Sequence, residues 1–111
     1  MKKHVDIRQE ARESKEQLQM ILQDVFAVVS ALDESADYVA DLAKAISDVM
    51  TDVASTGAWQ ASRVETNDAR LKGVFENAAN IQDVSVRVAV LDGLNKARQQ
   101  NRTMAAYFAL V

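Results

Sequence analysis

The residue types that carry catalytic or metal chemistry are scarce in this sequence. His4 is the only histidine, and it has no Glu-x-x-His partner of the kind that binds iron in helical bundles. The chain has no cysteine, which excludes disulfides, thiol catalysis and thiolate metal sites. Neither a glycine-rich phosphate loop nor a nucleophile elbow is present. We therefore expect no enzymatic activity, no cofactor and no metal ion.

Carboxylates recur about once per helical turn in the middle of the chain. Residues 33–56 carry six acids against Lys44 alone, a net charge of −5. The spacing lacks the tight loop and central glycine of a calcium site. A solvated helix face and a surface for a basic partner protein both remain as interpretations. The candidate residues of this acidic stripe are Asp37, Asp41, Asp48 and Asp52.

The second half is mildly basic, since residues 57–111 carry seven basic and five acidic side chains. Its modest basic patch lacks the clustering and the aromatic platforms of a nucleic-acid reader, so we expect no nucleic-acid partner. Pairing with the acidic stretch, within the fold or between copies, is the favoured role. The patch consists of Arg87, Lys96, Arg98 and Arg102.

Two apolar features are candidates for contact with a partner. Trp59 follows the expected turn, where it either caps the end of the core or forms a binding hot spot. The C-terminal tail is unusually apolar for a chain end. It either docks on the bundle or supplies a contact between subunits or to a partner. The candidate residues of the tail are Met104, Tyr107, Phe108, Leu110 and Val111.

The elements that position these residues are predicted to be helices. The chain has 111 residues, no proline and only three glycines, so few positions force a helix to end. Its hydrophobic share of 49% is enough for a core, whereas aromatic residues make up only 5%. This composition favours closely packed helices, and we expect an all-α protein forming a single helical domain over residues 1–111.

Apolar residues in the first half follow a spacing of three and four. Twelve of the fourteen seam positions are apolar, which predicts a helix over about 4–55 with coiled-coil-like heptad packing. A second helix starting at 33–35 is the alternative, because Asp33 is able to cap one. The seam consists of Ile7, Ala11, Ser14, Leu18, Ile21, Val25, Val28, Leu32, Ser35, Val39, Leu42, Ile46, Val49 and Val53.

The second half is less regular. A turn near 56–58, at Gly57, leads into a second helical arm over about 59–110. The apolar phase changes over 81–90, which predicts a break near 80–83. Residues 84–90 alternate like a strand, but no second strand is available to pair with them, so we favour helix. The architecture is therefore a long helical hairpin or an antiparallel bundle of three or four helices.

The segment Gly57-Ala58-Trp59-Gln60-Ala61 resembles the turn of the WXG100 family of small, leaderless secreted hairpins. The size, acidity and absence of cysteine are similar to that family. The sequence departs from the family's Trp-x-Gly motif at Ala61, and its first half is longer than is usual there. The resemblance implies a two-helix hairpin and export without a leader.

These patterns predict a structural or protein-interaction protein that acts through helix–helix packing and associates with itself or with another protein. The alternative is a small phage or secretion-associated adaptor, chaperone or inhibitor that binds a basic partner through its acidic face. The longest apolar stretch, 104–111, is too short to span a membrane. A cytoplasmic location is expected, with leaderless secretion or a place in a virion left open.

Overall fold

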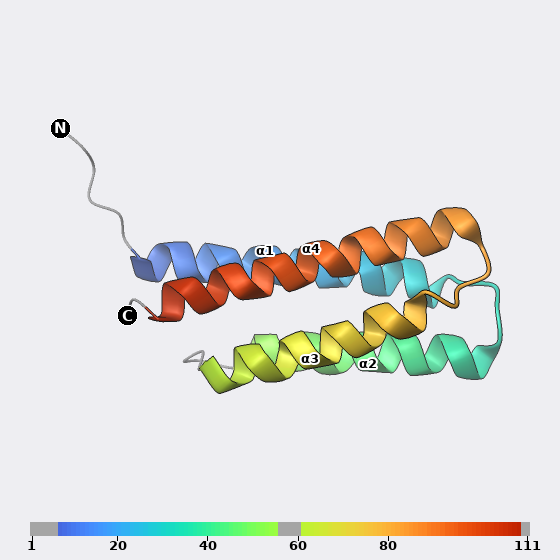
Figure 1. Ribbon diagram of the computed structural model, residues 1–111, viewed down its shortest axis with the longest axis horizontal. Coiled ribbons are helices and arrows are strands. Elements are labelled where there is room, and N and C mark those ends of the chain that lie inside the picture. Colours follow the sequence, from blue (N-terminus) through green and yellow to red (C-terminus); the bar gives the residue numbers. More distant parts are fainter. Residues whose placement is uncertain (1–6, 56–60, 110–111) are drawn as a thin grey trace.

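The computed structural model describes residues 7–55 and 61–109, which form four α-helices. They run alternately up and down, with α1 and α4 in one layer and α2 and α3 in the other (Figure 1). Each helix packs against two neighbours, so the contacts close into a ring. The all-α prediction is confirmed, and the bundle alternative matches the observed architecture. The helices are α1 (Ile7–Ser30), α2 (Ala36–Ser55), α3 (Ala61–Ala78) and α4 (Val84–Ala109).

The prediction of one continuous helix over about 4–55 is wrong, because α1 ends at Ser30 and α2 begins at Ala36. The Leu32 amide donates to the Val29 carbonyl, 3.1 Å away, which tightens the last turn of α1. The Val39 amide donates to the Ser35 carbonyl, 2.9 Å away, and starts α2. The three-and-four spacing of apolar residues continues across this reversal. Leu32 before it and Val39 after it both belong to that spacing, and both are half-buried.

Burial in α1 also departs from the strict heptad. The buried positions advance by 3.6 residues per turn on average, as in a straight helix, and not by 3.5. Two seam positions, Ile21 and Val28, are therefore turned to the edge of the helix interface, where Ile21 is half-buried and Val28 is exposed. The buried residues of α1 are Ala11, Ser14, Leu18, Leu22, Val25 and Val29.

The predicted break near 80–83 is confirmed between α3 and α4. The Val86 amide donates to the Asp83 carboxylate, 3.1 Å away, so Asp83 caps the start of α4. Residues 84–90 are helical, as favoured over strand. The alternating valines do not all lie on one side of the helix, since Val90 is buried while Val84 and Val88 are exposed.

The core is an aliphatic layer between the four helices. Its largest fully buried side chains come from every helix, which is why no pair of helices would bury it alone. Among the described residues, three polar side chains are also buried, namely Ser14, Asn67 and Asn101. The Asn101 amide donates to the Val64 carbonyl at 2.8 Å. The predicted turn at 56–58 lies outside the described residues.

Candidate functional site

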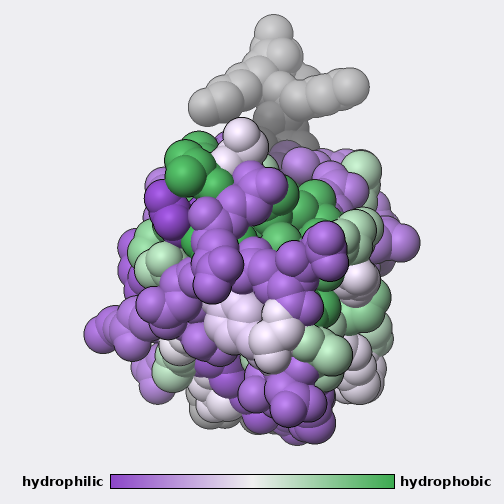
Figure 2. All heavy atoms as spheres, turned by 90° about the vertical axis from the view of Figure 1, so that its right-hand side faces the viewer, coloured by the Kyte–Doolittle hydropathy of each residue, from purple (hydrophilic) through white to green (hydrophobic). Residues whose placement is uncertain are grey.

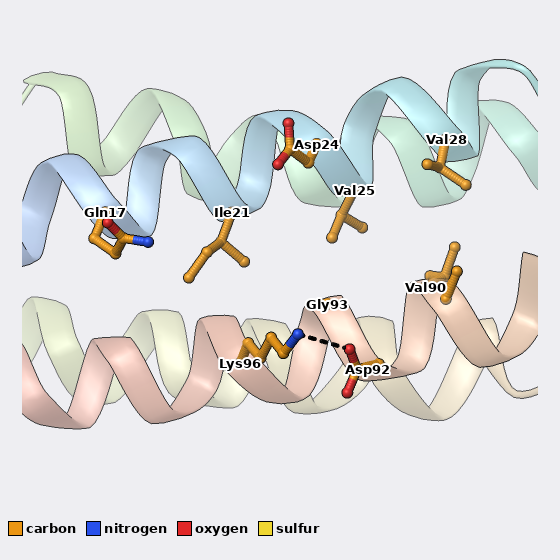
Figure 3. A pocket seen from close by; sticks show the side chains of 10 residues that line it. Gln17, Ile21, Asp24, Val25, Val28, Val90, Asp92, Gly93 and Lys96 are labelled. Atoms are coloured by element: carbon orange, nitrogen blue, oxygen red, sulfur yellow. Dashed lines mark ion pairs between the residues drawn. The ribbon is translucent and has the colours of Figure 1, made fainter.

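A groove runs along the outside of the contact between α1 and α4. Its first part is a hollow of about 350 Å³. Figure 3 shows Ile21, Val25 and Val28 of α1 pointing towards α4, with Val90 facing them from the other side. The lining residues are Gln17, Ile21, Asp24, Val25, Val28, Ala89, Val90, Asp92, Gly93 and Lys96.

Gly93 sets the closeness of the two helices at this level. A Cβ atom added there would lie only 2.5 Å from Cγ2 of Val25, a distance that real Cβ atoms do not tolerate. The β-branched Val25 has little rotamer freedom in a helix and cannot easily move aside. Glycine therefore lets α1 and α4 approach, and Val25 forms part of the groove floor.

The groove continues towards the connections at one end of the bundle. A second hollow, of about 680 Å³, shares Val28 with the first. On the α4 side the two hollows run from Asp83 to Lys96, thirteen residues of chain, roughly 20 Å at the helical rise. We call the two hollows together the α1–α4 groove. The second is lined by Val28, Ala31, Leu32, Asp33, Glu34, Gln82, Asp83 and Val86.

The rim of the α1–α4 groove is acidic. One ammonium group, that of Lys96, stands among five carboxylates and pairs with Asp92 at 3.0 Å (Figure 3). Both side chains of that pair are largely exposed, so the pair is weak. The rim carboxylates are Asp24, Asp33, Glu34, Asp83 and Asp92.

Glu34 strengthens the negative potential at the end of the groove. Its Oε1 accepts the Gln82 amide at 3.2 Å, while Oε2 is buried without a hydrogen-bond partner among the described residues. Burial raises the pKa of the nearby Tyr38 hydroxyl, and the negative charge of Glu34 raises this pKa further. The Glu34 charge is therefore incompletely compensated within the described part of the bundle.

The outer face of α4 is apolar where it begins. Val84 and Val88 lie one turn apart, and each is 60% exposed. Leu91 continues the four–three spacing and is half-buried, and Asn95 follows at the next position. We call these four residues the outer α4 seam. Figure 2 views the bundle from the end where α4 begins and shows hydrophobic side chains gathered in its upper part, broken up by hydrophilic ones.

The predicted acidic stripe does not form one uniform surface. Asp37 and Asp41 are exposed, and neither forms an ion pair within the described residues. Asp48 pairs with Lys44 at 3.2 Å on the same helix. Asp52 is half-buried and binds Arg63 of α3. The stripe is thus free at the start of α2 and neutralised towards its end.

The basic patch is paired differently from expectation. Arg98 and Arg102 both approach Asp68 of α3, at 3.3 and 3.8 Å. The Arg87 guanidinium donates to the Ile81 carbonyl at 3.0 Å. In the described part of the chain, these groups do not pair with the acidic stretch of residues 33–56. Arg98 and Arg102 reach Asp68 because α4 packs beside α3.

The predicted tail and turn residues fall into two groups. Met104 is fully buried and belongs to the core, so its side chain is not available to a partner. Tyr107 is half-buried near the end of α4. The others lie outside the described part of the chain: Trp59, Leu110, Val111 and the side chain of Phe108.

Sequence reasoning missed the two surfaces that the fold exposes. The apolar spacing predicts a buried seam that includes Ile21 and Val28, and it gives no sign of the packing role of Gly93. The four-residue spacing of Val84 and Val88 was an available signal, but nothing in the sequence indicates which side of α4 is covered.

Comparison with family models, with curated proteins and with solved structures finds no match to this chain. Its four helices differ from the two-helix hairpin that the WXG100 resemblance implies. Across residues 7–55 and 61–109, no group of three or more His, Asp or Glu side chains is arranged to hold a metal ion. None of the described helices is sufficiently long and apolar to cross a membrane.

Proposed function

We propose that this chain is a structural or protein-interaction protein that acts by helix–helix packing and not by catalysis. In this proposal, copies of the chain associate through the outer α4 seam. The observation that carries the proposal is the pair Val84 and Val88, one turn apart on a single face and each 60% exposed. Large apolar side chains exposed together are a common mark of an interface.

The spacing of the outer α4 seam supports a coiled-coil-like contact. Val84, Val88 and Leu91 follow the four–three repeat that places knobs opposite holes on a partner helix. Asn95 comes next in the repeat, and a single asparagine in such a seam fixes register between copies. A two-fold pairing of α4 with α4 would bury both valines of both copies, at about 1 kcal/mol per side chain before the entropy of association, since each is 60% exposed.

Light scattering over a range of protein concentrations tests self-association. We expect a mass that is a multiple of 12.2 kDa and that rises with concentration. Val88→Asp should shift the protein to the monomer without loss of helicity, because the residue is exposed. A wild-type chain that stays monomeric at every concentration would contradict self-association.

Met20→Asp is the matched control for Val88→Asp. Met20 is also 60% exposed, but it lies on α1, away from the outer α4 seam. The same charge is therefore introduced at the same exposure, and the oligomeric mass should not change. If both variants dissociate the oligomer equally, the contact does not lie on α4.

The second candidate is a small phage or secretion-associated adaptor, chaperone or inhibitor that binds a basic partner. The unpaired carboxylates Asp37 and Asp41 and the acidic rim of the α1–α4 groove favour it. Such binding should weaken steeply with salt, because exposed charges are screened beyond about 8 Å at physiological ionic strength. Association through the outer α4 seam should instead change little with salt.

A further inference from the structure

We infer that the α1–α4 groove binds a basic amphipathic helix of a partner protein. The inference rests on the proposed function in one respect, since it also has the protein act by helix packing. It uses a different surface, because none of the residues of the outer α4 seam lines the groove. The occupant is a separate chain and not a second copy.

The floor of the groove fits the apolar side of a helix. Ile21, Val25 and Val28 line one wall, and Val90 and Ala89 line the other. The groove follows α4 for roughly 20 Å, the length of a helix of about thirteen residues. A helix in a groove is read by apolar anchors at positions i, i+3, i+4 and i+7.

The rim selects the charge of that helix. Five carboxylates and a single ammonium group border an apolar floor, which leaves the groove strongly negative. Lysine and arginine side chains of a docked helix can lie with their stems along the floor and their charges at the rim. The negative potential of the rim would steer basic helices towards the groove over long range and would repel acidic helices.

The same charges argue against a second copy in the groove. The chain has a net charge of −3, so the acidic rim and a second copy repel each other overall. Like charges placed face to face oppose association. Asp24 at the middle of the groove forms no ion pair within the described residues, so its charge is open to a basic partner.

The probe is an 18-residue, fluorescein-labelled peptide of leucine and lysine, with leucines at i, i+3, i+4 and i+7. Fluorescence anisotropy measures its binding to the full chain at about 0.15 M salt. We expect saturable binding that weakens at least about ten-fold in the double variant Asp24→Lys/Asp92→Lys, because rim attraction becomes repulsion. Circular dichroism checks that the variant keeps its helicity.

The matched control is the double variant Asp48→Lys/Glu65→Lys. It makes the same change in net charge at two exposed carboxylates of α2 and α3 outside the groove, and Asp48, like Asp92, pairs with a lysine one turn away. At 0.15 M salt its effect on peptide affinity should stay below about three-fold, since distant charges are screened. An equal loss in both double variants would show a general charge effect and overturn the groove assignment.

A second pair of variants tests the apolar floor without changing charge. Val28→Ser, in the groove, should weaken the peptide about five-fold, since a buried methyl contact is lost and a hydroxyl is desolvated. Val88→Ser, on the outer α4 seam, should leave peptide affinity unchanged. Equal binding of a peptide with glutamate in place of lysine would overturn the inference, as would the absence of saturable binding.

The two proposals fail separately. Self-association is measured by light scattering without peptide, and it responds to Val88→Asp. An oligomer that dissociates on Asp24→Lys/Asp92→Lys, but not on Val88→Asp, would assign the groove to a second copy and contradict both proposals. Peptide binding to a strict monomer would support the groove and contradict self-association alone.

Discussion

The α1–α4 and α2–α3 contacts join antiparallel helices in the same bundle, yet they are built from different interactions. Polar side chains link α2 to α3 near both ends of their contact. Asp52 binds Arg63 and accepts the Asn67 amide at 3.0 Å, and the Tyr38 hydroxyl donates to the Asn77 carbonyl at 2.7 Å.

Among the described residues, the α1–α4 contact is polar only towards one end, where the Gln100 amide donates to the Ser14 carbonyl at 3.1 Å. Its middle is apolar and depends on the close approach at Gly93. The glycine of the other contact differs, since a Cβ atom at Gly73 would have nothing within 4 Å. One glycine is required by packing, and the other is not.

The grooves outside these two contacts differ in the same way. The hollow between α2 and α3, of about 270 Å³, is bordered by Asp48 and Arg70, one charge of each sign. The α1–α4 groove has five carboxylates against one lysine. Where polar pairs link two helices, their charges are neutralised within the fold. Where they meet through apolar residues, the flanking charges remain for a partner.

The largest effect is expected where the polar links of α2–α3 converge. Asp52→Ala should lower the free energy of unfolding by about 2 kcal/mol, because the buried Asn67 amide loses its acceptor and Arg63 its partner. Urea denaturation measures the loss. Asp24→Ala, at the exposed rim of the other contact, should change stability by less than about 0.5 kcal/mol. Similar losses in the two variants would show that the contacts do not differ in this respect.

The two glycines should respond to alanine with opposite signs. Gly93→Ala should destabilise the protein by about 1–2 kcal/mol, because its Cβ atom overlaps Val25 and forces the helices apart. Gly73→Ala should stabilise it by about 0.5–1 kcal/mol, since alanine has the higher helix propensity and open space to occupy. Thermal denaturation of both variants gives the signs. A stabilising Gly93→Ala would refute the close approach.

The smallest effect concerns Tyr38. Tyr38→Phe removes the hydrogen bond to Asn77 and should cost about 1 kcal/mol. The pKa of Tyr38 is raised above the ordinary tyrosine value of 10.0, so the folded state holds the proton more tightly. Its contribution is complete below pH 10 and is lost as the pH rises through the folded pKa. Denaturation above pH 10 should therefore show a decline that Tyr38→Phe reduces; an unchanged decline would exclude Tyr38 as its source.

Composition and local spacing alone determined the helical class, the break near 80–83 and the helix over 84–90. Proline, which is absent here, and the capping residue Asp83 affect only the residues next to them, so their effects can be predicted from the sequence. The reversal at 31–35 was not determined in this way. Leu32 and Val39 keep the apolar spacing across it, and only the docking of α2 onto α1 shows that the chain turns back there.

The tertiary structure alone decided which apolar and charged residues remain for a partner. Ile21 and Val28 match a core seam in sequence, but the drift of a straight helix turns them to the edge of the contact with α4. The sequence leaves open whether Met104 docks on the bundle or contacts a partner, and the structure buries it in the core. Hydrophobic spacing specifies that a face must be buried. Whether another helix of the same chain covers it depends on contacts between residues far apart in sequence.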